Sequence, residues 1–355
     1  MDIREIFTPA AIAANWEEAA SNRIPYLGEG LFPAQKKAGL DLSWIKGSKG
    51  LPVSLMPSAF DAKATFRDRI GVEKVETEMP FFREGFKIKE KDRQELLRAQ
   101  DSNDPYATAV LARLFDDAGN LIEGANVVPE RQRFQLLFSE NPGIAIKANG
   151  VDYTYNYDPN GDWNTNNFFE LTGDEAWGAL SAADPFEQFD TVASAIQAKT
   201  GTAPAILIMN SVTLNLLSKL DAVKERFLST SGMAVGYITK AQVAQIIQDT
   251  VNMTIAVYDK QYKDESGQVH KFVPDNYIAF IPEGPLGSTW YGVSPEEADL
   301  MSGASDAQVS IVNTGVAITQ IIDPHPVNVN TFASEIVLPS FERMNECALM
   351  KVAAD

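Results

Sequence analysis

Apolar residues recur at helical spacing in the first part of the chain. Thr8 and Pro9 begin a pattern that predicts a helix to about Ala20, because a hydroxyl cap and an early proline both favour a helix start. The longest pattern begins at Asp104 and Pro105. Its members are separated by four and three residues in turn: Ala107, Leu111, Leu114, Ala118, Leu121, Ala125 and Val128. This single stripe predicts a helix of about six turns.

Three residues that disfavour helices lie on or near this stripe, namely Gly119, Gly124 and Pro129. They predict a kink or a break before the pattern resumes between Arg131 and Phe138. A coiled coil would show the same stripe, but the small alanines in this stripe favour a helix that lies close on a sheet or on another helix. We therefore expect the leucines of the stripe to face the core of their own subunit.

The segments on either side of residue 51 have a different pattern. From Pro25 to Pro57 glycine and proline are frequent, which predicts an extended arm that needs another surface to lie against. From Leu51 to Ile88 stretches of alternating apolar and polar side chains predict a long hairpin. A capping box at Asp92 and Glu95 then predicts a short helix to about Gln100.

The predicted hairpin carries charges of both signs, which is consistent either with a solvated flap or with a docking element. A two-stranded ribbon is marginally stable in water without a surface to cover. The apolar group Met79-Pro80-Phe81-Phe82 favours docking, because a solvated flap has little reason to carry it. We expect the hairpin to contact a neighbouring subunit through Arg67, Arg69, Glu76, Glu78, Phe81 and Phe82.

Beyond Gly150 the pattern alternates between strands and helices. Helices are predicted from Asp184 to about Lys199, with Gly201 as the terminating residue, and from Ser211 to Leu220. The predicted strands are Val151–Tyr155, Ala205–Met209, Ile255–Tyr258 and Tyr277–Phe280. Since the second of these strands is continuously apolar, it should be buried on both faces. This half is typical of a central sheet covered by helices.

Composition and charge exclude several classes of protein. The 355 residues are 45% hydrophobic and 22% charged, enough for one large domain or two closely connected ones. The net charge of -18 disfavours general attraction to nucleic acid or to an anionic membrane. The start of the chain lacks a secretion signal, and no apolar run reaches about 18 residues, so we expect a soluble protein made in a cytoplasm.

No constellation of residues supports catalysis. Phosphate loops, nucleophile elbows and paired-histidine metal helices are absent from the sequence. Asp158, Asn160 and Asp162 are spaced like the start of a calcium loop, but Trp163 and Phe169 stand where that loop needs glycine and glutamate. We therefore predict neither a metal site nor a cofactor.

The remaining candidates for chemistry are two histidines and one cysteine. His270 follows a polar turn and should be solvated, and His325 lies between two prolines as a rigid-turn residue. Cys347 has no histidine near it in sequence, so a buried, inert thiol is favoured over a nucleophile. Pairing two of the many carboxylates as acid and base would need a fold that the pattern does not provide.

Several short motifs resemble those of one family of viral proteins. They are Tyr258-Asp259-Lys260-Gln261-Tyr262, Phe272-Val273-Pro274-Asp275-Asn276, Gly284-Pro285-Leu286-Gly287 and Tyr291-Gly292-Val293-Ser294-Pro295-Glu296-Glu297. The hairpin end Phe86-Lys87-Ile88 and the late stretch Ser334 to Pro339 agree in order and spacing. Together they resemble the lambda-like major capsid protein E family of tailed bacteriophages, from the first helix to the end of the chain.

The resemblance implies the Hong Kong 97-type phage capsid fold, an α+β fold. Its parts would be an N-terminal arm (1–50), an extended loop (51–88), a peripheral domain with a spine helix (89–183), an axial domain (184–323) and a return to the peripheral domain (324–355). An arm and a hairpin that cannot fold alone would gain their partners from adjacent subunits.

The resemblance also implies a structural function without catalysis. Copies of the chain would form hexamers and pentamers of an icosahedral shell that encloses double-stranded DNA without sequence-specific binding. Scaffold, portal and decoration proteins would be its partners, and the protein would occur in the virion and, during assembly, in the host cytoplasm. Two alternatives are the shell of a cellular nanocompartment, which holds protein cargo, and a hydrolase.

Overall fold

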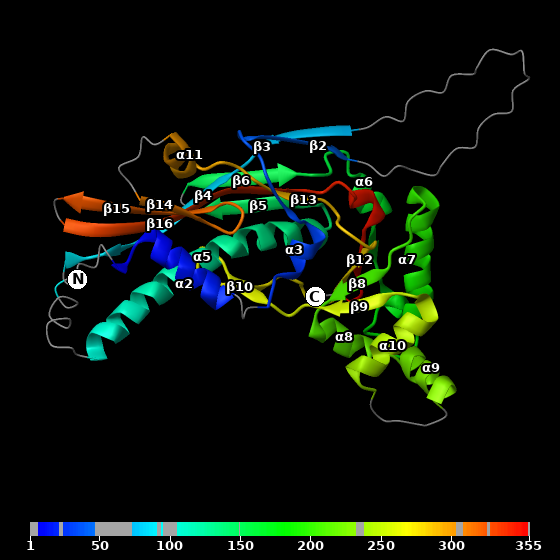
Figure 1. Cartoon of the computed structure of the whole chain (residues 1–355). Helices are drawn as coiled ribbons and strands as arrows, with labels where there is room; N and C mark the ends of the chain where they lie inside the picture. The colour runs from blue at the N-terminus through cyan, green and yellow to red at the C-terminus, as the bar shows by residue number, and fades with distance from the viewer. Residues whose placement is uncertain are drawn as a thin grey trace, which may run out of the picture. The chain divides into compact units, whose positions relative to one another are not determined.

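The computed structural model describes residues 6–20, 24–46, 73–90, 94, 105–148, 150–231, 238–302, 308–324 and 327–353 (Figure 1). The chain divides into two compact units. The first contains Met1–Leu42, Glu76–Gln132 and Ser288–Ser340, and the second contains Ser43–Val75, Arg133–Gly287 and Phe341–Asp355. The predicted short helix from Asp92 to Gln100 lies, apart from residue 94, outside the described residues.

The first unit is built on a sheet of six strands. Its strand order is β1-β13-β16-β15-β14, with β4 also beside β16. These strands are β1 (Ala34–Lys36), β4 (Phe81–Ile88), β13 (Ser288–Tyr291), β14 (Gln308–Val312), β15 (Val316–Pro324) and β16 (Val327–Ser340). The helices are α2 (Pro9–Ala20), α3 (Leu27–Leu31), α5 (Pro105–Leu137, of which the residues to Gln132 belong to this unit) and α11 (Pro295–Ser302).

Strand β4 belongs to the sheet of its own subunit. It runs antiparallel to β16, from the pair Phe81 and Ile336 to the pair Ile88 and Val329. The ribbon of two strands is instead formed by β2 (Asp41–Lys46) and β3 (Glu73–Glu78). The prediction that Leu51 to Ile88 forms one hairpin is therefore wrong for its last eight residues, because β16 offers them a long neighbouring strand. Residues 47–72 lie outside the described part of the chain.

The N-terminal segment packs in its own subunit. The predicted first helix is confirmed as α2, and the Thr8 hydroxyl accepts a hydrogen bond from the amide of Ala11 at 3.2 Å. The predicted apolar face of this helix is buried with Phe7 in the core of the first unit. Further along, Phe32 and Leu42 are also buried. The described part of the predicted arm thus lies against its own chain, and contacts of the arm with adjacent subunits stay a prediction.

Helix α5 is continuous, so of the predicted kink or break the break is wrong. It passes through Pro129, which lacks an amide hydrogen and cannot donate to the carbonyl four residues earlier. Ile122 before the proline and Leu136 after it are both buried. Burial of both flanks outweighs one missing hydrogen bond, because helices in proteins are stabilised mainly by packing.

The stripe along α5 faces the core as predicted, with a shift at one position. Ala118 and Ile122 are each 1% exposed, and Leu111 and Leu114 pack partly against the same core. The predicted stripe contained Leu121 where the structure buries Ile122, and Leu121 is only half-buried. An α-helix has 3.6 residues per turn, so a stripe extended over several turns drifts by about one position.

The second unit is built on a sheet of five strands in the order β7-β17-β12-β8-β9. These strands are β7 (Phe168–Glu170), β8 (Ile206–Met209), β9 (Thr254–Val257), β12 (Tyr277–Ile281) and β17 (Ala348–Lys351). Two further ribbons consist of β5 (Gly143–Ala148) with β6 (Val151–Asn156), and of β10 (Gln261–Lys263) with β11 (Val269–Lys271). The α-helices are α6 (Asp162–Asn166), α7 (Pro185–Thr200), α8 (Ser211–Leu217), α9 (Asp221–Ser231) and α10 (Lys240–Val251), and short 3-10 helices cover Gly173–Glu175 and Met344–Glu346.

The predicted helices and strands of this unit are confirmed. Asp184 caps α7 by accepting hydrogen bonds from the amides of Phe186 and Glu187 at 2.9 and 3.3 Å. Gly201 ends the helix with a φ of +79°. Strand β8 is buried as its apolar run predicted. Helices α9 and α10 were not predicted.

The two units divide the chain at residues other than the predicted domain boundaries. Strands β14, β15 and β16 form one antiparallel meander, so position 324, where the axial domain was expected to end, lies inside one sheet. The last segment, Phe341–Asp355, belongs to the second unit, where β17 pairs with β12 and β7. The assignment of peripheral and axial positions in a shell stays a prediction.

Candidate assembly surfaces

The residues predicted to contact a neighbouring subunit lie in different structural settings. Arg67 and Arg69 are outside the described residues, and Glu76 belongs to strand β3. Glu78, the last residue of β3, is exposed. Phe81 and Phe82 are half-buried at the start of β4, in the sheet of their own subunit. Their role between subunits stays a prediction.

The apolar group around Phe81 anchors β4 in its own unit. Met79 is 3% exposed and Pro80 is buried. The Arg83 guanidinium lies 4.9 Å from the centroid of the Phe81 ring. The argument that this group exists for docking is therefore weakened, since most of its apolar surface is already covered within the subunit.

Helix α11 is fixed to the first unit by charged contacts that the sequence did not indicate. Glu296 forms an ion pair with Arg83 and accepts a hydrogen bond from the Ser334 hydroxyl at 2.9 Å. Glu297 pairs with the Lys36 ammonium at 2.6 Å. At its other end the helix exposes 77% of Met301. It is thus held by its acidic first turn and has its apolar side chains at the surface.

Two carboxylates on α5 hold the segment around α3. The Tyr26 hydroxyl donates to Glu123 at 2.7 Å, and the Gly28 amide donates to Glu130 at 3.1 Å. Glu123 and Glu130 are seven residues apart and so lie on one face of the helix. Burial, together with the hydrogen bond to Glu123, raises the pKa of Tyr26 well above its usual value. The hydroxyl therefore stays protonated and continues to donate.

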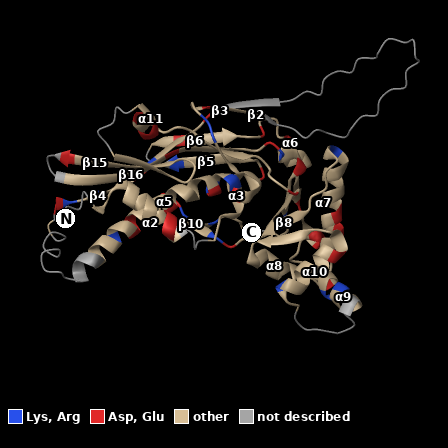
Figure 2. Cartoon of the chain, viewed as in Figure 1, with Lys and Arg blue, Asp and Glu red and all other residues tan. Residues whose placement is uncertain are grey.

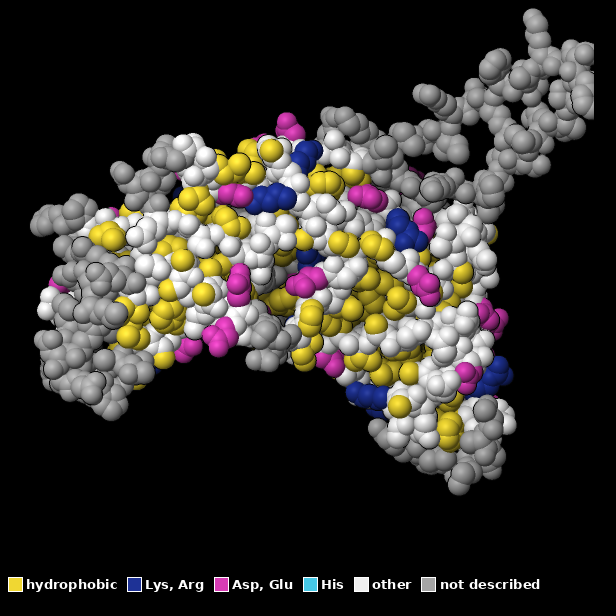
Figure 3. All heavy atoms as spheres, viewed as in Figure 1, with side chains coloured by type: hydrophobic (Ala, Val, Ile, Leu, Met, Phe, Trp, Pro, Cys, Tyr) yellow, Lys and Arg dark blue, Asp and Glu magenta, His cyan; other side chains and the backbone are white. Residues whose placement is uncertain are grey.

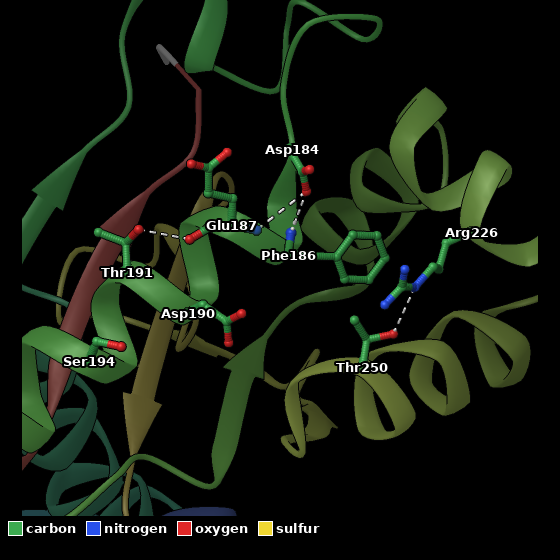
Figure 4. Close-up of a pocket in the computed structure, with 8 residues that line it drawn as sticks. All are labelled: Asp184, Phe186, Glu187, Asp190, Thr191, Ser194, Arg226 and Thr250. Carbon is green, nitrogen blue, oxygen red and sulfur yellow. Dashed lines mark hydrogen bonds between the residues drawn. The ribbon is translucent and has the colours of Figure 1, made fainter.

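A surface hollow of about 690 Å³ lies in the second unit among helices α7, α9 and α10 (Figure 4). Three carboxylates, of Asp184, Glu187 and Asp190, line it from the first half of α7. Phe186 and Arg226 also line it, with the guanidinium carbon 5.7 Å from the ring centroid. The Arg226 Nε donates to the Thr250 hydroxyl at 3.5 Å. We call this hollow the α7 groove.

The α7 side of the groove comes from an acidic part of the sequence. Between Lys147 and Lys199 the sequence has nine Asp and Glu and no Lys or Arg. Several of these acids are on α7 or at its start, and acidic positions are visible along this helix in Figure 2. Such a surface attracts cationic groups and repels others like itself.

The candidates for chemistry lie where a structural role explains them. Asp158 is buried and accepts a hydrogen bond from the Trp163 amide at 2.7 Å, so it satisfies an amide in the first turn of α6. His270 is exposed, as predicted, with its Nε2 2.8 Å from Asp264. Cys347 is buried, as predicted, and burial raises the pKa of its thiol well above its usual value. His325 is outside the described residues.

The described ranges contain neither a cluster of metal ligands nor a membrane-spanning helix. No group of three or more His, Cys, Asp or Glu is placed to hold a metal ion in that part of the chain. None of the helices described is long and apolar enough to cross a membrane. Figure 3 shows hydrophobic side chains mixed with charged ones on the visible face.

The fold is that of phage capsid proteins. A putative capsid protein from a prophage of E. coli CFT073 shares 13% identity, with a TM-score of 0.60 over 98% of this chain and 99% of that one. A phage-related protein from Bordetella bronchiseptica RB50 also shares 13% identity, with a TM-score of 0.54 over 98% and 97%. No match was found among curated proteins. The predicted α+β Hong Kong 97-type fold is confirmed.

The family follows from the sequence match. The model of phage major capsid protein E matches residues 8–352, which is nearly the whole chain. The chain belongs to the phage major capsid protein E family, and its function is that of a major capsid protein of the icosahedral shell. The resemblance drawn from the short motifs is confirmed.

Proposed function

We propose that copies of this chain assemble in the host cytoplasm into hexamers and pentamers, which close as a shell around the double-stranded DNA of a tailed phage. The family match over residues 8–352 carries this proposal. Scaffold and portal proteins would act with it during assembly, and a decoration protein would bind the finished shell. The chain itself would have a structural role without catalysis.

The charge of the chain supports a container that does not adhere to its contents. At -18 per copy, a shell of many copies is strongly anionic, as is the DNA that it encloses. A basic lining would hold the DNA by charge neutralisation, whereas an acidic one leaves it free to be packed and released. The shell would therefore enclose DNA without sequence-specific binding.

The ribbon of β2 and β3 supports contacts between subunits. A ribbon of two strands is marginal on its own. The segment that joins these two strands in sequence contains the apolar residues Leu51, Leu55, Met56, Phe60, Phe66 and Ile70. Such a segment gains stability by lying on another surface, and in a shell the adjacent subunit provides one.

Electron microscopy of the purified, concentrated chain tests this function. We expect closed shells, tubes or sheets, because a major capsid protein contains the contacts needed for self-association. A chain that remains monomeric over a wide range of concentration and salt would contradict the proposal. A broad screen for hydrolysis on the same sample would test the structural role separately, and turnover of any substrate would count against it.

A further inference from the structure

The ribbon of β10 and β11 has aromatic packing on one face and exposed side chains on the other. Tyr262 and His270 are opposite each other on one face, and Lys263 is opposite Val269 on the other. The Tyr262 ring packs 5.5 Å from His270 and 4.9 Å from Phe272. On the other face Val269 is 58% exposed and Lys263 is exposed. The ribbon thus presents a cation and an apolar side chain next to each other.

The turn of this ribbon is fixed by one carboxylate. Asp264 accepts hydrogen bonds from the amides of Ser266 and Gln268 at 2.9 and 2.8 Å, and from the Ser266 hydroxyl at 2.7 Å. Its hydrogen bonds, first those from Ser266 and His270, hold the pKa of Asp264 well below its usual value. A turn so fixed keeps the exposed face in one orientation, which lowers the entropy lost when it binds a partner.

The α7 groove has the complementary set of groups. Its carboxylates on Glu187 and Asp190 are exposed, and Phe186 provides an apolar surface. Within the same groove Arg226 already places a cation over that ring. The groove therefore combines negative charge with an aromatic face, and this combination suits a lysine accompanied by an aliphatic side chain.

The two surfaces lie on different sides of the second unit. In Figure 1, β10 is on one side of strands β8, β9 and β12, and α7 is on the other side. A closed ring of identical subunits requires two different patches that complement each other, one on each side of the subunit. Ribbon and groove satisfy this requirement by charge and by position.

We propose that the face of the β10–β11 ribbon with Lys263 and Val269 docks in the α7 groove of a second copy of this chain. Lys263 would pair with Glu187 and Asp190, and Val269 would pack against Phe186. The inference rests on the proposed self-assembly of the chain, since it names one of the contacts by which copies join.

Charge reversal tests the pairing. Lys263→Glu and Asp190→Lys should each raise the concentration needed for assembly about tenfold, because each puts like charges together at every ring contact. The chain that carries both substitutions should recover most of the loss, since the pair is restored with opposite polarity. Lys219→Glu and Asp299→Lys are matched controls on exposed residues outside ribbon and groove, and should leave assembly within about twofold.

Disulfide formation between copies tests the proximity directly. Cys347 is the single cysteine and is buried, so new thiols can be read without interference. Assembled particles of the variant with Asp190→Cys and Val269→Cys should, after oxidation, give covalent ladders up to the capsomer size on non-reducing gels. Either cysteine alone should give no ladder.

The outcomes separate this contact from the function on which it rests. If the wild type forms shells but the double charge reversal assembles no better than the single variants, the proposed contact is overturned and shell formation still stands. The same conclusion follows if the variant with both cysteines gives no ladder. A disulfide between the new cysteine of the Asp190→Cys variant and a different protein would also overturn the contact. If the wild type fails to assemble at all, the proposed function itself fails. Variants would be compared only where thermal unfolding shows that they are folded.

Discussion

Gly85 on β4 lies directly opposite Phe332 on β16, and the phenylalanine ring occupies the space that any side chain at position 85 would need. A Cβ placed on Gly85 would run into that ring and would lie 2.7 Å from the carbonyl oxygen of Thr331. The strand that was expected in a hairpin docked on a neighbouring subunit is therefore fitted closely to the sheet of its own subunit.

Gly85→Ala should destabilise the subunit by about 1 to 3 kcal/mol, the usual cost of overpacking. Gly119→Ala is the matched control, because a Cβ at this helical position has nothing within 4 Å. It should stabilise by about 0.4 to 1 kcal/mol. Urea unfolding of unassembled subunits measures both values. Equal effects of the two substitutions would show that β4 does not pack as described.

The loss of stability on truncating a side chain of α5 should increase with the burial of that side chain. Ile122→Ala removes a side chain that is 1% exposed and should cost about 2 to 5 kcal/mol. Leu114 is only half-buried against the same core, so Leu114→Ala should cost about half as much. The same unfolding measurement applies. A larger loss at Leu114 than at Ile122 would place the core on a different face of the helix.

Removal of residues 51–70 should separate folding from assembly. A short Gly-Ser linker in their place leaves β2, β3 and β4 intact, whereas a deletion that extends to Glu84 would remove residues paired with β16. We expect a folded subunit that does not form shells, as judged by circular dichroism and electron microscopy. A linker of equal length with the residues scrambled is the control. Closed particles from the shortened chain would mean that the segment is a dispensable flap.

Salt should affect the first encounters between subunits. At -18 per copy, net repulsion opposes association, and ions screen exposed charges beyond about 8 to 10 Å. Moderate salt should therefore speed assembly, followed by light scattering at several ionic strengths. A steady fall in rate with salt would instead show that complementary pairs control the encounter. In that case the pairing of Lys263 with Asp190 is the first to examine.

The local sequence pattern predicted an element correctly where the residues that determine it are close together in the sequence. The cap at Asp184 and the terminator Gly201 both belong to α7 itself, so its bounds could be predicted to within a residue. Helix α10 could have been found in the same way, since Thr239 and Gln242 form a complete capping box. Pro129 misled the prediction because a sequence rule describes an isolated helix, and burial around this one decides otherwise.

The surfaces depend on contacts between distant residues and could not be predicted. Arg83 and Glu296 are more than 200 positions apart, and no periodicity connects them. The α7 groove is lined by α7 together with Arg226 of α9 and Thr250 of α10, and neither α9 nor α10 was predicted. The polar turn before His270 was visible in sequence, but which face of the ribbon is exposed follows from the packing of Tyr262. Short motifs in a shared order nevertheless identified the family.

An electron cryomicroscopy reconstruction of particles formed by the purified chain tests the central claim most directly. The account predicts closed particles with icosahedral symmetry, in which each subunit fits the two units described and adjoins identical copies in hexamers and pentamers. Particles without this symmetry, or a chain that gives only monomers at high concentration, would contradict it.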